Sequence, residues 1–128
     1  MDPIANFLTQ IRNAYKAHHE TLSAPYSKIK EQIASLLKDA GFISDAKVEG
    51  QVPNKKLFLT LVYQGKQAVL THLSRISTPS VRVYSPSALL RSPLSGRGLK
   101  IISTSKGLMT DRQAKKAGLG GEVICQIW

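Results

Sequence analysis

The residues of this sequence best suited to chemistry are three consecutive hydroxyl side chains followed by a lysine and a glycine, Ser103-Thr104-Ser105-Lys106-Gly107. Hydroxyl groups can donate to and accept from phosphates, ribose hydroxyls and base edges, and a lysine adds a positive point charge. The glycine gives the backbone freedom. These residue types suit a nucleic-acid strand. An ordinary polar surface loop has the same composition, so the run alone leaves both interpretations open.

Catalysis is not indicated by these residues. Ser105 and Lys106 are adjacent, and adjacent side chains of an extended chain rarely point at each other, so they do not form a nucleophile and its base. No G-x-x-x-x-G-K-[ST] phosphate loop occurs, and Gly96-Arg97-Gly98 is followed by Ile101 where a dinucleotide fingerprint needs a third glycine. The sequence therefore predicts that the protein is not an enzyme and takes no small-molecule substrate.

Metal and redox sites are not indicated either. His18 and His19 are neighbours at a predicted helix end, where their side chains diverge, and this favours a solvated helix end over a metal site. Cys125 has no second cysteine to pair with. Its place on an alternating strand favours a buried apolar role over a reactive thiol. We expect no metal and no other cofactor.

Tyr84, two residues after Arg82, has two interpretations. Its ring could offer an aromatic face to a base beside a cation, which would make both residues candidates for RNA binding. A strand tyrosine is more often part of the core, and this alternative is the commoner one.

The charge of the chain indicates a polyanionic partner. Its 128 residues include 18 Lys and Arg against 8 Asp and Glu, a formal net charge of +10 at pH 7. Between residues 51 and 110 every charged residue is basic: Lys55, Lys56, Lys66, Arg75, Arg82, Arg91, Arg97, Lys100 and Lys106. Such a field attracts phosphate backbones, so nucleic acid is the first partner to consider and an anionic membrane surface the second. A basic face that only keeps the protein soluble is the third interpretation.

Composition and length indicate a folded protein of one domain or two small halves. With 42% hydrophobic residues the chain can bury a core. No apolar run approaches the roughly 18 residues of a membrane span. The start Met1-Asp2-Pro3-Ile4 lacks a basic region followed by an apolar stretch, so we expect no secretory signal, no membrane insertion and a cytoplasmic location.

The first half predicts two helices over an antiparallel sheet. Asp2-Pro3 is a good helix start, and apolar residues recur at helical spacing to about Lys16. A second helix is predicted between its N-cap Ser27 and Gly41. Strands at 42–49, 57–63 and 68–76 would form a meander, with connections across residues 52–54 and 64–65.

The second half predicts a small sheet with short helices. The small residues and proline of Ser77-Thr78-Pro79-Ser80 mark the junction between the halves. Strands are predicted at 81–84 and 99–102, with a short helix opened by Ser85-Pro86 between them. The run 103–107 is expected as a loop. We therefore predict an α+β fold with an N-terminal subdomain over 1–78 and a C-terminal RNA-binding subdomain over 79–128.

The last thirty or so residues carry dense local signals. Thr110 and Gln113 match a capping box at the start of a short helix, and Gly118 can stop that helix. Gly120 and Gly121 suit a tight turn better than a phosphate cradle. From Glu122 the apolar alternation predicts a final strand that closes a small sheet.

The segment from Ile101 to Arg112, with the run Ser-Thr-Ser-Lys-Gly at its centre, resembles the signature of the bacterial-type small-subunit (30S) ribosomal protein S8 family. The resemblance extends over nearly the whole chain. It also includes these segments: Asp2-Pro3-Ile4-Ala5, Arg12-Asn13-Ala14, Pro25-Tyr26-Ser27-Lys28, Gly41-Phe42-Ile43, Arg75-Ile76-Ser77, Val81-Arg82-Val83-Tyr84, Gly120-Gly121-Glu122-Val123 and the terminal Trp128.

The resemblance implies a two-domain α+β protein that binds the central domain of small-subunit ribosomal RNA early in assembly. The protein would stay there as a structural component, beside neighbouring small-subunit ribosomal proteins. The implied RNA contacts in the serine-rich run are Ser103, Thr104, Ser105, Lys106 and Gly107. Further implied contacts are Tyr84, Gly121, Glu122, Lys30 and Lys55. An implied alternative is a translational repressor that binds a similar stem in the messenger RNA of its own operon.

A few positions depart from the pattern of the family. Asn6 replaces a common aspartate, Gln113 replaces a usual glutamate, and Arg97 interrupts a Gly-Leu-Gly segment. Ser80 stands where a glycine usually follows the proline. A positive φ at that turn would disfavour serine, so the shape of the turn is in question.

Overall fold

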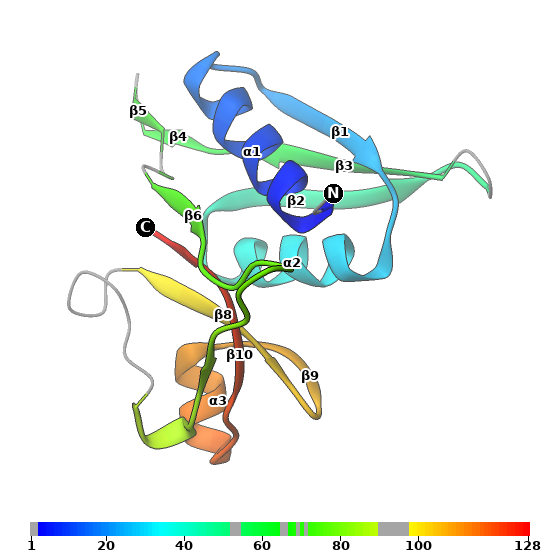
Figure 1. Ribbon diagram of the computed structural model, residues 1–128. Helices are drawn as coiled ribbons and strands as arrows, with labels where there is room; N and C mark the ends of the chain where they lie inside the picture. Colours follow the sequence, from blue (N-terminus) through cyan, green and yellow to red (C-terminus); the bar gives the residue numbers. More distant parts are fainter. Residues whose placement is uncertain (1–2, 52–54, 65–66, 69, 71, 90–97) are drawn as a thin grey trace. The chain divides into compact units, whose positions relative to one another are not determined.

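The computed structural model describes residues 3–51, 55–64, 67–68, 70, 72–89 and 98–128 (Figure 1). The chain divides into two compact units, one formed by Pro3–Leu70 and the other by the chain from Thr71 to Trp128. Each unit combines helix with antiparallel sheet, which confirms the predicted α+β class. The predicted helix start at Asp2 and the predicted connection at 52–54 lie outside the described residues.

The two helices of the N-terminal unit form where their apolar stripes and, for the second helix, the N-cap Ser27 predict them. Helix α1, Pro3–Lys16, buries a stripe at helical spacing: Phe7, Leu8, Ile11, Ala14 and Tyr15. Helix α2, Lys28–Asp39, begins at Ser27, whose hydroxyl accepts from the backbone N–H of Lys30 at 3.2 Å. It ends before Gly41, which has a φ of +86°.

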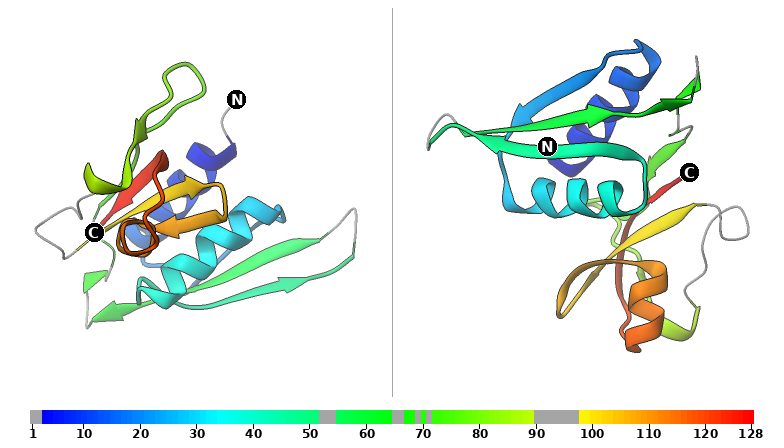
Figure 2. Two further views of the ribbon diagram at one scale, coloured as in Figure 1. Left: turned by 90° about the horizontal axis from the view of Figure 1, so that it is seen from below. Right: turned by 180° about the vertical axis from the view of Figure 1, so that it is seen from behind.

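The sheet of this unit has the strand order β1-β3-β2. Strand β1, Thr21–Pro25, and strand β2, Ile43–Glu49, flank the central strand β3, Lys56–Leu61. Burial alternates along β3, with Leu57, Leu59 and Leu61 inward. The helices cover this inward face (Figure 2). No predicted element corresponds to β1.

The predicted third strand at 68–76 is wrong as a member of this sheet. Strand β5, Gln67–Ala68, pairs only with β4, Tyr63–Gln64, whereas β6, Leu73–Arg75, belongs to the sheet of the C-terminal unit. Strand β6 pairs there with β10, Gly121–Ile127, far along the chain. A period of two indicates a strand but does not indicate its partner, and here the partner is non-local.

The sheet of the C-terminal unit is centred on β10. Its order is β6-β10-β8-β9, and β7, Tyr84–Ser85, also pairs with β10. Strand β8 spans Leu99–Thr104 and β9 spans Gly107–Thr110. Only Tyr84 of the strand predicted at 81–84 is in strand conformation, and the predicted Ser85-Pro86 helix is a single 3-10 turn at Ser87–Leu89.

Helix α3, Asp111–Ala117, covers one face of this sheet (Figure 2). Ala114 packs there in a small buried cluster with Ile102 and Val123. The capping box of Thr110 and Gln113 is confirmed, and Gly118 ends the helix with a φ of +70°. The buried carboxylate of Asp111 accepts from the Lys100 N–H at 3.0 Å, which ties the start of α3 to β8.

Candidate nucleic-acid interface

Strands β8 and β9 form a hairpin whose tip is the exposed pair Ser105 and Lys106. The hydroxyl of Thr104 donates to the Gly107 carbonyl at 2.8 Å and accepts from the Lys106 N–H at 3.2 Å, so it holds the tip in shape. Gly107 has a φ of +107°, where a side chain would be strained. The prediction of a loop over 103–107 is therefore wrong in extent. Ser103 and Thr104 end one strand and Gly107 begins the next, because the strands stay paired up to the tip.

A row of four residues crosses the sheet just behind this tip. Tyr84 on β7 lies opposite Glu122 on β10, Glu122 lies opposite Ser103 on β8, and Ser103 lies opposite Leu108 on β9. Directly paired residues of antiparallel strands place their side chains on one face. Ile102 and Val123 pack with α3, so this row lies on the other face. The sheet brings together three of the predicted contacts, which are distant in sequence.

Tyr84 is one of the most exposed large apolar residues, with 69% of its surface accessible. The commoner interpretation of a strand tyrosine as part of the core is wrong here. Strand β7 is only two residues long and lies at the margin of the sheet, where it pairs with β10 alone. Its ring is available for stacking on a flat ligand.

Gly121 is required by the close approach of β10 to β8. A Cβ atom at this position would lie 2.1 Å from the Ser103 carbonyl oxygen, far inside any normal contact. At Gly120 a Cβ would lie 2.6 Å from the Ser85 carbonyl oxygen. The two glycines let β10 run close to β8 and β7, so Gly121 acts on the candidate interface through the position of Ser103.

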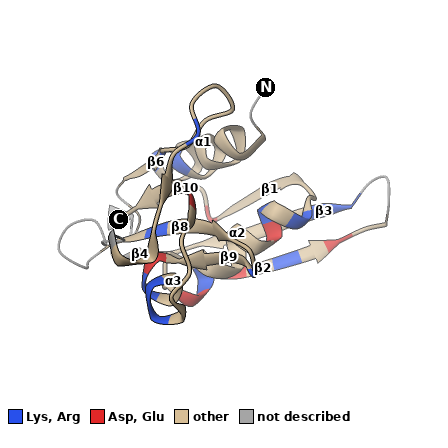
Figure 3. Ribbon diagram, turned by 60° about the horizontal axis from the view of Figure 1, so that its bottom comes forward, with Lys and Arg blue, Asp and Glu red and all other residues tan. Residues whose placement is uncertain are grey.

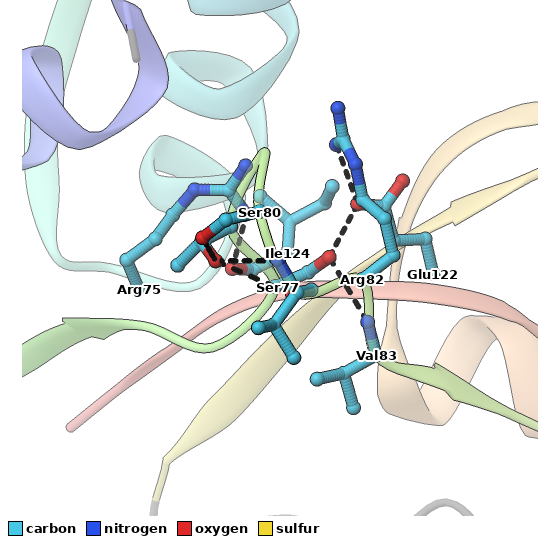
Figure 4. Close-up of polar contacts among 9 residues, drawn as sticks. Arg75, Ser77, Ser80, Arg82, Val83, Glu122 and Ile124 are labelled. Carbon is cyan, nitrogen blue, oxygen red and sulfur yellow. Dashed lines mark hydrogen bonds and ion pairs between the residues drawn. The ribbon is translucent and has the colours of Figure 1, made fainter. Parts of the chain in front are cut away.

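The side chains of Glu122 and Arg82 form an ion pair. Arg82 Nη1 lies 2.9 Å from Glu122 Oε2, and the Ser77 hydroxyl donates to the same oxygen at 2.5 Å (Figure 4). The Ser77 hydrogen bond, followed by the Arg82 hydrogen bond and the charges of Arg82 and Arg75, holds the pKa of Glu122 below its usual value. Ser77 was not among the predicted site residues. Its sequence signals are the small-residue cluster assigned to the junction and the segment Arg75-Ile76-Ser77 of the family resemblance.

The turn that follows Ser77 does not need a glycine at Ser80. Among the described residues other than glycine, only His18 has a positive φ, so serine at position 80 is unstrained. The Thr78 hydroxyl accepts from the Val81 N–H at 3.1 Å, and the Val81 N–H also donates to the Thr78 carbonyl at 3.2 Å. Hydrogen bonds of Thr78 thus fix this turn without a glycine.

Basic side chains extend the positive surface of this unit beyond the tip. Arg112, Lys115 and Lys116 are exposed on α3, and Figure 3 shows basic segments along this helix. Lys106 is exposed at the hairpin tip. Exposed cations of this kind attract phosphate without reading sequence.

Lys30 and Lys55 lie in the N-terminal unit, not with the hairpin. Lys55 Nζ is 4.0 Å from the centre of the Tyr26 ring, and the Tyr26 N–H donates to the Lys55 carbonyl at 3.1 Å. Lys30 Nζ donates to the carbonyl of Pro25 at 3.3 Å. The two lysines therefore flank the end of β1 and form a separate candidate contact.

The remaining features to place are the Cys125 thiol, possible metal ligands and possible membrane-spanning helices. Cys125 is fully buried, as predicted, and burial raises the pKa of its thiol to about 12. Among the described residues, no three His, Cys, Asp or Glu side chains gather as metal ligands. In the same part of the chain, no helix is both long and apolar enough to cross a membrane.

Comparisons with known proteins agree over the whole length of the chain. A family model described as ribosomal protein S8 matches residues 2–128. The chain is 46% identical over 127 residues to the small ribosomal subunit protein uS8 of Mycoplasmopsis pulmonis, with 99% of this chain and 96% of the relative covered. It is 47% identical over 129 residues to the proteins of the same name from Synechocystis sp. and Clostridium novyi, with 99% of this chain and 97% of each relative covered.

Proposed function

We propose, because this chain belongs to the ribosomal protein S8 family, that it binds the central domain of small-subunit ribosomal RNA directly and helps that RNA to assemble. The family membership makes it a structural component of the small ribosomal subunit in the cytoplasm and not an enzyme. The proposal concerns which RNA it binds and which residues make the contact.

One observation carries the proposal: the exposed hairpin tip and the exposed Tyr84 ring belong to a single sheet. Ser105 and Lys106 at the tip offer a hydroxyl and a cation, and Ser103 lies in the same cross-strand row as Tyr84. Double-helical RNA is recognised mainly by shape and through 2′-hydroxyl and phosphate groups, while unstacked bases pack on aromatic rings. A surface with both kinds of group fits an irregular stem better than a regular duplex.

The tip can recognise shape because its geometry is fixed before binding. Strands β8 and β9 are paired up to Thr104 and Gly107, and Thr104 closes the turn with two hydrogen bonds. A preorganised surface loses less conformational entropy on binding than a flexible loop. In this proposal Ser103, Ser105 and Lys106 contact the RNA, whereas Thr104 and Gly107 shape the tip and Gly121 allows β10 to approach β8.

Long-range attraction comes from the basic character of the chain. Its net charge of +10 raises the rate of encounter with RNA and adds a salt-dependent contribution to affinity. Arg82 remains about half exposed while it holds Glu122, so its other N–H donors can meet a phosphate. Lys30 and Lys55 supply a second phosphate contact from the N-terminal unit.

The same surface suits a second RNA of similar shape. Shape recognition through a hairpin tip carries little base information, so a similar stem in the messenger RNA of its own operon would be bound as well. Translational repression is therefore the alternative function of this surface, and the experiment below separates the two RNAs.

The test is to crosslink the protein to RNA in its own cells and sequence the RNA recovered, for the natural chain and for a variant with Ser103, Thr104 and Ser105 changed to alanine. A control variant changes three exposed hydroxyl residues of the N-terminal unit to alanine: Thr21, Ser23 and Ser35. We expect one central-domain stem to be enriched, with the enrichment lost only in the first variant. Recovery of messenger RNA alone would replace the ribosomal proposal with the repressor. Scattered recovery that neither variant changes would contradict both.

A further inference from the structure

Ser77 is a buried hydroxyl whose hydrogen bonds all lead to the candidate interface. It is fully buried, and among the described residues only Asp111 joins it as a buried polar side chain. A buried hydroxyl is costly unless it is hydrogen-bonded. Ser77 Oγ donates to Glu122 Oε2 at 2.5 Å and accepts from the Val83 N–H at 3.1 Å (Figure 4). Glu122 belongs to the cross-strand row that contains Tyr84, and Val83 directly precedes Tyr84 in the chain.

The backbone around Ser77 forms a closed loop on β10. The Ser77 N–H donates to the Val123 carbonyl at 3.1 Å, and the Val123 N–H donates to the Val83 carbonyl at 2.8 Å. The chain therefore leaves β10 at Ser77 and returns to it at Val83, opposite the same residue. The Ser77 hydroxyl bridges the two ends of this loop, and Tyr84 follows directly.

The carboxylate of Glu122 connects this bridge to the charged surface. Its Oε2 accepts hydrogen bonds from both the Ser77 hydroxyl and the Arg82 guanidinium. The Glu122 side chain is only 16% exposed. Arg75 lies nearby and donates to the Ile124 carbonyl at 2.7 Å. One hydroxyl thus orients the carboxylate that in turn orients Arg82.

We propose that Ser77 is a positioning residue of the RNA-binding surface, which it serves without touching the RNA by fixing the Glu122–Arg82 pair and the return of the chain to Tyr84. This inference rests on the proposed function. Removing the hydroxyl would leave the Val83 N–H without its acceptor and would remove one hydrogen-bond donor from Glu122 Oε2. Arg82 and Tyr84 would then have to be ordered at the moment of binding, which lowers affinity.

The test compares two neighbouring hydroxyls in binding to a transcript of the small-subunit central domain. Ser77→Ala removes the bridge, whereas Thr78→Ala removes a hydroxyl that bonds within its own turn and does not contact Glu122. We expect Ser77→Ala to weaken binding about tenfold and Thr78→Ala less than about threefold, because only the first frees the Glu122–Arg82 pair. Circular dichroism establishes that each variant is folded at the binding temperature.

Two further readouts separate positioning from general stability. Hydrogen exchange at the Val83 amide should accelerate in Ser77→Ala even without RNA. Ser77→Ala should weaken binding less in the Glu122→Gln background than in the natural chain, because part of the effect of the hydroxyl passes through that carboxylate. If Ser77→Ala does not fold, Ser77→Cys has similar size with a weaker donor, and it should show a smaller loss of the same kind.

The possible results distinguish a failure of the positioning role of Ser77 from a failure of the proposed function. Unchanged affinity in folded Ser77→Ala, or in Ser77→Cys if that is the variant available, would overturn the positioning role while the proposed function stands. Additive losses in the double variant would also overturn it. Failure of the natural chain to bind the transcript above its binding to an unrelated duplex would instead overturn the proposed function.

Discussion

Both units of this protein have an apolar core, but the C-terminal unit adds polar contacts that position the candidate RNA-binding segments. In the N-terminal unit, α1, α2 and β3 bury large apolar side chains, among them Phe7, Ile33 and Leu57. The C-terminal unit also buries apolar side chains along β8 and β10, among them Ile101, Ile102 and Ile127, but polar contacts fix the segments at the margin of its sheet. Apolar packing stabilises without direction, whereas hydrogen bonds set positions.

The difference matches the roles proposed for the two units. The segments that carry Tyr84, Arg82 and the hairpin tip are short and lie at the margin of a sheet, where little apolar area can hold them. Hydrogen bonds of Ser77 and Thr104 hold them instead. Substitutions in the apolar core of the N-terminal unit should therefore change stability, and those in the marginal segments of the C-terminal unit should change RNA binding as well.

The largest expected effect is on stability in the N-terminal unit. Phe7→Ala removes a fully buried ring and should lower the free energy of unfolding by about 3–5 kcal/mol. Thr9→Ala, at an exposed position of the same helix, should change it by less than about 0.5 kcal/mol. Urea titration measures both. A loss below about 1 kcal/mol for Phe7→Ala would mean that packing does not dominate this unit.

Gly121→Ala should both destabilise the C-terminal unit and abolish specific RNA binding. The added Cβ meets the Ser103 carbonyl at 2.1 Å, so β10 and β8 must separate, at an expected cost of about 3 kcal/mol. Gly118→Ala is the matched control. Its Cβ meets no atom within 4 Å, so it incurs only the strain of its positive φ, about 1 kcal/mol. Equal losses for the two variants would contradict the close approach of the strands.

Glu122 should make the stability of the C-terminal unit depend on pH. Its pKa is lower in the folded protein than in the unfolded chain, chiefly because of the Ser77 hydrogen bond and then Arg82. The stabilisation is therefore full above the unfolded value, near 4.3, and is lost as pH falls through the lower folded value. Thermal unfolding between about pH 6 and pH 3 should show a smaller loss for Glu122→Gln than for the natural chain. Parallel curves would contradict the role of the carboxylate.

The smallest expected effect is the charge contribution of the hairpin tip. Lys106→Ala should reduce the slope of log affinity against log salt by about 0.7–0.9, the amount for one phosphate. Lys16→Ala, at an exposed position at the end of α1, is the control and should leave the slope unchanged. An unchanged slope for Lys106→Ala would show that this lysine does not contact the RNA backbone.

The helices could be predicted from the sequence because their signals are local. The apolar stripe of α1, the N-cap Ser27 of α2 and the capping box of α3 each lie within a few residues of the element that they specify. The final strand could also be predicted locally, from the apolar residues that follow Glu122, although Val123, Ile124 and Cys125 are buried in succession across a register shift and do not alternate strictly. The hydroxyls and lysine of the hairpin tip could also be singled out, because they adjoin one another in the chain.

Non-local pairing explains what the sequence did not predict. Strand β1 has weak alternation and depends on β3, and β6 depends on β10, which lies far along the chain. The row from Tyr84 to Ser103 exists only through β10. The sequence signals at Ser77 did not indicate its role, because that role depends on a carboxylate 45 positions away.

The most direct test of the account compares the affinity of Ser105→Ala for the central-domain transcript and for an unrelated RNA duplex. Ser105 is exposed at the hairpin tip and its hydroxyl has no structural bond in the described contacts, so the change should leave the fold intact. Ser35→Ala, exposed on α2, is the control. The account predicts weaker binding to the transcript with unchanged binding to the duplex. Equal losses on both RNAs, or no loss on either, would contradict the claim that the hairpin tip recognises ribosomal RNA.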